Sequence, residues 1–230
     1  MSDPESALYQ PKPGEAFQFR KVLFIPEALG LFAVNIEQLL KLMLVVDTHS
    51  IYYHLNHPYF SRVSVQPDYP GGFSIWAGKM AAEPLLAERL AGVTPLEFRG
   101  DIPGLRMQYV QIISQYLLDR SAARRAPEGR EFAFCSTRLM VTATPLRAST
   151  PQELLEGIAK TNSMAIYAHL YDAPMRLGRP ENDFSAWLRN SAQRPDLADA
   201  LSKIDPYSDS IEGVRERLVR ALSTGLLGRD

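Results

Sequence analysis

Two histidines, His54 and His169, stand between apolar neighbours at distant points of the chain. An imidazole can act as a general base, a metal ligand or a pH-dependent switch. On a helix, His54 would share a face with His57, and His169 with Asp172, because residues three apart lie on the same side. Each pair offers two metal ligands, but zinc needs three or four protein ligands, so we predict no metal. A polar binding pocket and a buried ring bonded to the backbone or a tyrosine remain as interpretations.

The two tryptophans of the chain, Trp76 and Trp187, each follow a phenylalanine by three residues, Phe73 and Phe184. This spacing puts the two rings of each pair on one helical face. Such a face can serve as an aromatic platform for a sugar or a peptide. The alternative is packing in the core, where aromatic side chains contribute much of the buried area.

Arg106 and Arg215 stand in two segments of similar pattern. A guanidinium can hold a phosphate or a carboxylate with two parallel hydrogen bonds, and an ion pair within the chain is the alternative. Cys135 has no matching base, so we do not predict a nucleophile. Phosphate-loop, dinucleotide-binding, nucleophile-elbow and zinc-protease motifs are absent from the sequence. We therefore assign no catalytic residue and no cofactor, and whether the chain is an enzyme stays uncertain.

These residues recur in pairs because the chain contains an internal repeat. His54 and His169 align at an offset of 115 residues, and the same offset aligns Phe17-x-Phe19 with Phe132-x-Phe134. The tryptophans align at 111 and the arginines at 109, so the length changes fall where loops are expected. We predict an N-terminal tail over 1–14, a first repeat over 15–120, a linker over 121–130 and a second repeat over 131–230.

Each copy opens with a short alternating run that predicts a strand, followed by about five helices. Thr150-Pro151 with Glu153 is typical of a helix start, and Asn35 is a cap at the corresponding place. The fold class is therefore mainly α (α+β), as a tandem duplication of a helical domain with about 100 residues. We expect the two strands to pair, because paired strands leave fewer exposed edges.

The second copy carries a combination of motifs in fixed order. They are Ile166–Leu170, Asn182–Trp187, Leu197–Pro206 and Val214-Arg215. With these motifs the chain resembles the family of unknown function called DUF5752 over residues 15–225. The first copy matches more loosely, since Gly71-Gly72 replaces Asn182-Asp183. The resemblance implies the fold and implies no activity.

The totals are those of a soluble globular protein, with 46% hydrophobic residues, 22% charged residues and a net charge of −1. This balance gives no field that would attract nucleic acid. The polar start lacks the features of a signal peptide, and no apolar stretch is long enough to span a bilayer. One cysteine cannot form an internal disulfide. We expect a cytoplasmic protein without membrane insertion and without bound nucleic acid.

The two copies differ most in and before their first helix, where the first copy is apolar. Its residues there are Phe32, Val34, Leu42, Leu44 and Val45, opposite Arg147, Ser149, Gly157, Ala159 and Lys160. A helix that becomes apolar on its second face buries that face, so we predict that these five residues contact a protein partner or the other copy. The tail with Tyr9, Pro11 and Pro13 is either an arm onto a partner or a disordered leader.

The sequence therefore favours a non-catalytic interaction or accessory subunit of a larger assembly, homo- or hetero-oligomeric. The alternative is a protein that binds a sugar or sugar phosphate, or an enzyme acting on one. Its site would contain the repeated residues His54, His169, Trp76, Trp187, Arg106 and Arg215.

Overall fold

The computed structural model describes residues 12–61, 69–98, 100–119, 124–178 and 181–228. Tyr9 and Pro11 of the predicted arm lie outside these residues. The chain forms two compact units. Unit 1 combines residues up to Leu23 with Met140–Asp230, and unit 2 combines Phe24–Arg62 with Pro67–Leu139. The predicted boundaries at 15–120 and 131–230 concern repeats along the sequence and stay a prediction, whereas the compact units divide the chain within its two strands.

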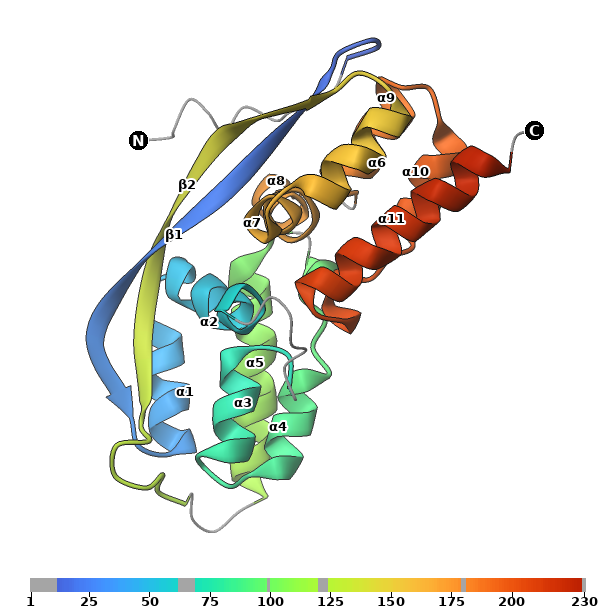
Figure 1. Ribbon diagram of the computed structural model, residues 1–230. Helices are drawn as coiled ribbons and strands as arrows, with labels where there is room; N and C mark the ends of the chain where they lie inside the picture. The colour runs from blue at the N-terminus through green and yellow to red at the C-terminus, as the bar shows by residue number, and fades with distance from the viewer. Residues whose placement is uncertain (1–11, 62–68, 99, 120–123, 179–180, 229–230) are drawn as a thin grey trace. The chain divides into compact units, whose positions relative to one another are not determined.

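The strands are β1 (Phe17–Ala33) and β2 (Phe132–Ala148), which pair as a two-stranded sheet (Figure 1). The Gln18 side chain donates to the carbonyls of Thr144 and Leu146, and the Thr137 hydroxyl donates to that of Ile25. Later residues of β1 pair with earlier residues of β2, so the strands are antiparallel. The predicted pairing of the two strands is confirmed.

The prediction of short strands was wrong, because each strand has 17 residues. Alternation of buried aromatic residues marks only the first few positions of each strand. Further along β1, neither Pro26 nor Gly30 favours a strand, and the apolar residues around them are largely exposed. A burial pattern of this kind gives no period-two signal that could extend the prediction.

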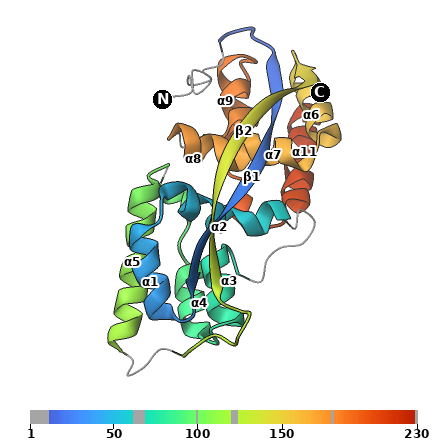
Figure 2. The same ribbon diagram turned by 90° about the vertical axis from the view of Figure 1, so that its left-hand side faces the viewer.

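The helices of unit 2 are α1 (Ile36–Val45), α2 (Thr48–Ser61), α3 (Gly72–Lys79), α4 (Pro84–Ala91) and α5 (Ile102–Leu118), with a 3₁₀ turn at Pro95–Phe98. The Asn35 side chain accepts a hydrogen bond from the Gln38 amide, so the predicted cap is confirmed. Helices α1 and α5 lie side by side (Figure 2). The buried face of α5 contains Leu105, Tyr109 and Ile113, which is the apolar face that its sequence pattern predicts.

The helices of unit 1 are α6 (Pro151–Lys160), α7 (Ser163–Tyr167), α8 (Ala173–Leu177), α9 (Asp183–Asn190), α10 (Pro195–Ser202) and α11 (Ile211–Leu227). A 3₁₀ turn covers Pro206–Ser208, and a π-helical turn over Ala168–Asp172 joins α7 to α8. The Thr150 hydroxyl accepts from the Glu153 amide, which confirms the predicted helix start. Pro174 aligns with Pro58 of α2 at an offset of 116, one more than the histidines, and a π turn accommodates such an extra residue.

Candidate functional site

His169 is held by hydrogen bonds at both ring nitrogens inside unit 1. Its Nδ1 lies 2.9 Å from Oδ2 of Asp183, and its Nε2 accepts the backbone N–H of Arg20 at 2.8 Å. Because Nε2 accepts, the ring proton of the neutral form is on Nδ1 and is donated to the carboxylate. The side chains of His169 and Asp183 are only 4% and 8% exposed. The nitrogen that would act as a base is thus occupied by the chain's own backbone.

His54 occupies the equivalent position in unit 2, where its Nε2 accepts the backbone N–H of Cys135 at 2.9 Å. The residue aligned with Asp183 is Gly72, and a Cβ there would lie 2.9 Å from the His54 carbonyl oxygen, so this position has no room for a carboxylate. Burial, together with a smaller effect of the nearby His57, lowers the pKa of His54 to about 3. His54 is therefore a neutral hydrogen-bond acceptor near pH 7.

Both tryptophans are buried and use their indole N–H groups within the fold. Trp187 Nε1 donates to the Glu15 carbonyl at 2.6 Å, and Trp76 Nε1 donates to the Arg130 carbonyl at 2.7 Å. Glu15 and Arg130 are related by the same offset of 115 residues as the histidines. The structure thus places the predicted aromatic platforms in the two cores.

The strand segment in each unit completes an aromatic cluster around the histidine. In unit 1 the ring of Phe17 lies 4.8 Å from that of His169 and 5.3 Å from that of Phe184. In unit 2 the ring of Phe132 lies 4.5 Å from that of His54 and 5.2 Å from that of Phe73. Each unit therefore takes its helices from one predicted repeat and its buried strand aromatics from the other.

Arg215 connects two helices of unit 1, α11 and α6, by hydrogen bonds. Its Nε donates to Glu212 at 2.7 Å, and Nη1 donates to the carbonyls of Ile158 and Thr161 at the end of α6. Burial acts to raise the pKa of Glu212, but the hydrogen bonds from Arg215 and Ser163 outweigh it and hold that pKa below its ordinary value.

Arg106, the equivalent residue of unit 2, faces no such carboxylate on its own helix. The position that aligns with Glu212 is Pro103, and the Nε of Arg106 is buried without a hydrogen-bond partner. The structure thus brings each histidine and tryptophan to one cluster per unit, and it puts the arginines on the last helix of each unit in different surroundings.

The predicted partner-interface residues lie in unit 2 with different exposures. Phe32 is 58% exposed and Val45 is 73% exposed, and Leu44 is exposed as well. Val34 and Leu42 are half-buried. Their role as an interface stays a prediction.

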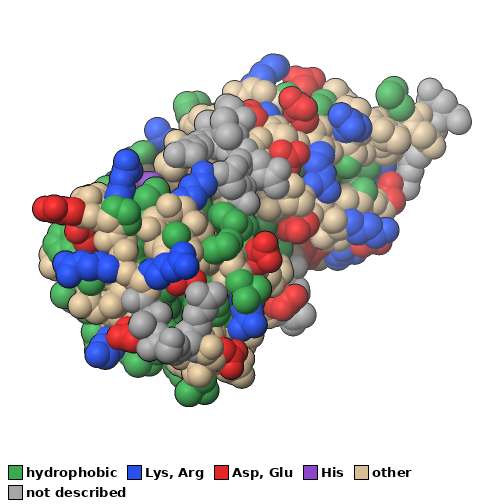
Figure 3. Space-filling model, turned by 90° about the horizontal axis from the view of Figure 1, so that it is seen from below, with side chains coloured by type: hydrophobic (Ala, Val, Ile, Leu, Met, Phe, Trp, Pro, Cys, Tyr) green, Lys and Arg blue, Asp and Glu red, His purple; other side chains and the backbone are tan. Residues whose placement is uncertain are grey.

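Three further aligned positions, which the sequence comparison missed, are uncharged in unit 2 and charged in unit 1. Leu85, Met107 and Gln111 are exposed in unit 2, where the aligned residues of unit 1 are exposed and charged. The charged counterparts are Asp196, Glu216 and Arg220. The alignment at offsets of 111 and 109 could have found them. On the face drawn in Figure 3, hydrophobic side chains reach the surface between charged ones.

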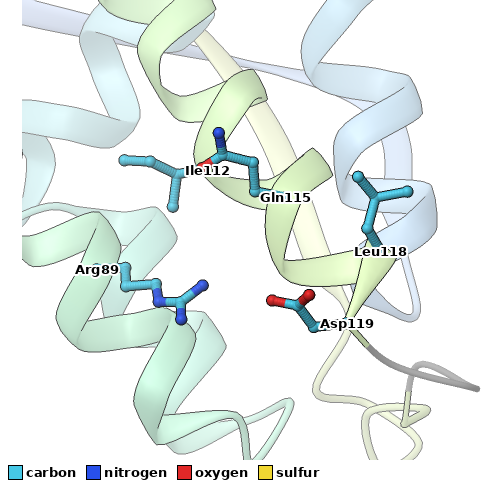
Figure 4. Close-up of a pocket in the computed structure, with 5 residues that line it drawn as sticks. All are labelled: Arg89, Ile112, Gln115, Leu118 and Asp119. Carbon is cyan, nitrogen blue, oxygen red and sulfur yellow. The ribbon is translucent and has the colours of Figure 1, made fainter.

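A surface hollow of about 590 Å³ lies in unit 2 between α4 and α5 (Figure 4). Its lining consists of Arg89, Ile112, Gln115, Leu118 and Asp119. The charged ends of Arg89 and Asp119 face one another across it in the figure. No residue of the predicted binding set lines this hollow.

Within the described ranges, no group of three or more His, Cys, Asp or Glu side chains could hold a metal ion. No helix within the same ranges is long and apolar enough to cross a membrane.

The fold is that of a mainly helical α+β protein with one two-stranded antiparallel sheet. The chain belongs to the family described as "Family of unknown function (DUF5752)", whose match is a single one over residues 14–223. The solved structure of OrfY from Thermoproteus tenax is similar, with 27% sequence identity and a TM-score of 0.77, over 93% of this chain and 96% of that chain. No curated protein matches the sequence. The family resemblance and the fold class, apart from the duplication, are thereby confirmed.

Proposed function

We propose that this chain is a non-catalytic interaction subunit and that unit 2 carries its docking surface. The observation that carries the proposal is an exchange of exposed residue types between aligned positions. Exposed Phe32 and Val45 of unit 2 stand where unit 1 exposes Arg147 and Lys160. Depletion of charge together with exposed apolar side chains is typical of the central part of a protein interface.

The surroundings of the repeated histidines and tryptophans support the same proposal. Each imidazole Nε2 and each indole N–H is bonded to the chain's own backbone. A sugar or sugar phosphate would have to displace those bonds to reach these groups. No specific observation favours the ligand-binding alternative, which stays a hypothesis, as do a cytoplasmic location and the absence of bound nucleic acid.

We infer further that the chain is a tandem duplication, with one copy specialised for binding. Ala82 and Gln193 support this inference. Among the described residues other than glycine, only these two have positive φ angles, 55° and 53°, and they align at the offset of the tryptophans. The equivalent bonds of the histidines and tryptophans support it as well. A duplicated chain can keep one copy unchanged in its surface while the other gains a contact.

The test is affinity capture of the tagged full chain, comparing Val45→Lys with the matched control Lys160→Val. We expect one stoichiometric protein to be captured by the wild-type chain and by the control. Val45→Lys should lower its recovery about tenfold or more, because a charge buried in an apolar contact costs a few kcal/mol. Equal loss with both variants, or capture of nothing by the wild-type chain at native concentration, would contradict the proposal.

A further inference from the structure

Helix α5 presents an uncharged outer face. The residues exposed on that face are Met107, Gln108, Gln111, Gln115 and Leu118, with Ser114 half-buried beside them. The aligned helix α11 carries Glu216, Arg217 and Arg220 in the first half of the corresponding face, and Ser223, Thr224 and Leu227 in the second half, which is uncharged in both helices. Solvent-exposed helix faces ordinarily carry charge, so the outer face of α5 has the composition of a contact surface.

Four of these residues form a seam along the helix, which we name the α5 seam: Met107, Gln111, Ser114 and Leu118. Their spacings are four, three and four residues, which keeps side chains in line along one edge of a helix and is the spacing used by packed helix pairs. Met107 is 53% exposed and Leu118 is 85% exposed, so both apolar ends of the seam are open to solvent.

The order of residues in the α5 seam is self-complementary when two copies run antiparallel. Such a two-fold arrangement places Met107 of one chain opposite Leu118 of the other, and Gln111 opposite Ser114. The apolar ends then cover one another. In the middle, the glutamine amide and the serine hydroxyl can each donate and accept. No like charges meet on the seam, and the two helix dipoles are opposed.

The hollow between α4 and α5 fits the same arrangement, since Gln115 and Leu118 belong to both the hollow and the outer face of α5 (Figure 4). In the antiparallel pair, Met107 of the second copy comes to the rim of this hollow. Methionine is a flexible apolar side chain that fills irregular gaps. Ile112 gives the hollow an apolar wall, while Arg89 and Asp119 give it a charged side.

We propose that the α5 seam is where a second copy of this chain binds, as a two-fold symmetric homodimer with antiparallel α5 helices. The proposal rests on the proposed function in one respect, that unit 2 is the interacting unit. In this proposal the exposed residues Phe32, Leu44 and Val45 remain free for the other protein. A two-fold homodimer is the commonest symmetric assembly of soluble proteins, and a seam without charge offers nothing that would select a charged partner instead.

The test is the mass of the purified full chain in solution, measured by light scattering over a wide range of concentration. We expect a dimer whose Kd rises on the order of a hundredfold in Met107→Glu, because that substitution brings two unpaired carboxylates into the interface. The matched control Glu216→Met, at the aligned position of α11, should leave the Kd unchanged. The double variant Met107→Glu with Leu118→Lys should restore the dimer, since the antiparallel order puts each glutamate opposite a lysine.

A monomeric wild-type chain, or a dimer that Met107→Glu leaves intact, overturns the α5 seam proposal. Failure of the double variant to restore the dimer overturns the antiparallel order. Val45→Lys separates the two proposals, because it should abolish capture of the other protein and leave the dimer unchanged. If Val45→Lys dissociates the dimer, the second copy binds at α1 and the α5 seam proposal is wrong.

Discussion

The two units hold equivalent histidines and arginines in different chemical surroundings. In unit 1 a carboxylate, Asp183, faces the buried histidine, and a Glu212–Arg215 pair ties α11 to the end of α6. In unit 2 the aligned positions are Gly72 and Pro103, and neither can supply a carboxylate. The surfaces differ in the same direction, since unit 2 exposes Phe32 and Val45 where unit 1 exposes Arg147 and Lys160.

At these aligned positions unit 2 has fewer charged side chains than unit 1, around the histidine and on the last helix as well as at the surface. Unit 2 has its own buried polar contact, in which the Tyr116 hydroxyl donates to Glu83 at 2.5 Å. The residues aligned with that pair are Arg194 and Gly225, and Arg194 donates to the Gly225 carbonyl instead. The two units thus keep a contact at the same place with different groups.

Lowering the pH should produce the largest difference between the units. The unfolded chain takes up a proton at His54 near its ordinary pKa of 6.5, whereas in the fold that pKa is about 3. Between these values the unfolded state binds more protons, so the free energy of unfolding falls as the pH falls from about 6.5 towards 3, by up to about 1.4 kcal/mol per pH unit. Urea unfolding at a series of pH values measures this slope.

The control for the pH experiment is His54→Gln, whose amide oxygen can still accept the Cys135 N–H. This variant should lose stability at neutral pH but should show a smaller dependence on pH than the wild-type chain. An unchanged slope would show that His54 is not the group responsible.

Removal of the carboxylate from the buried pair should have the next largest effect. Asp183→Ala leaves the His169 Nδ1–H buried without its acceptor, so we expect unit 1 to lose about 2–3 kcal/mol of stability. Asp196→Ala removes an exposed partner of Arg194 and should cost less than about 1 kcal/mol. Denaturant unfolding of the two variants gives both values, and equal losses would contradict the comparison.

The two aligned arginines should differ in the same direction by a smaller amount. Arg215→Met leaves the carbonyls of Ile158 and Thr161 without their donor and should cost about 2 kcal/mol. Arg106→Met removes a side chain whose Nε is buried and has no partner, so it should be neutral within about 1 kcal/mol. A larger loss in Arg106→Met than in Arg215→Met would break the comparison between the units.

Much of the local structure could be predicted from the residues themselves. Thr150, Asn35 and Asn182 each accept a backbone N–H of the following turn, which is what their side chains favour at a helix start. The pairing of the strands followed from the cost of exposed edges. These signals are local in the sequence or depend on residue type alone.

The partners of the buried side chains could not be predicted. The two histidines accept the backbone N–H groups of Arg20 and Cys135, and a backbone amide carries no sequence signal. For the same reason, the alternating phenylalanines indicate burial without indicating which helices they meet. The first half of the outer face of α5 was detectable in principle, because the residues of α11 aligned with Met107, Gln108 and Gln111 are charged, but only once the two units are compared helix by helix.

The order in which the chain is synthesised gives the division of the strands one more consequence. The last residue of unit 2 is Leu139, so the ribosome completes this unit before it translates the helices of unit 1. Phe17 and Phe19 belong to unit 1, and their neighbours in α9 emerge only after all of unit 2. At ordinary rates of elongation, on the order of ten seconds pass between the synthesis of these two phenylalanines and the synthesis of α9, against which they pack. During that interval the aromatic residues of the strand are exposed in the nascent chain, where a chaperone can bind them.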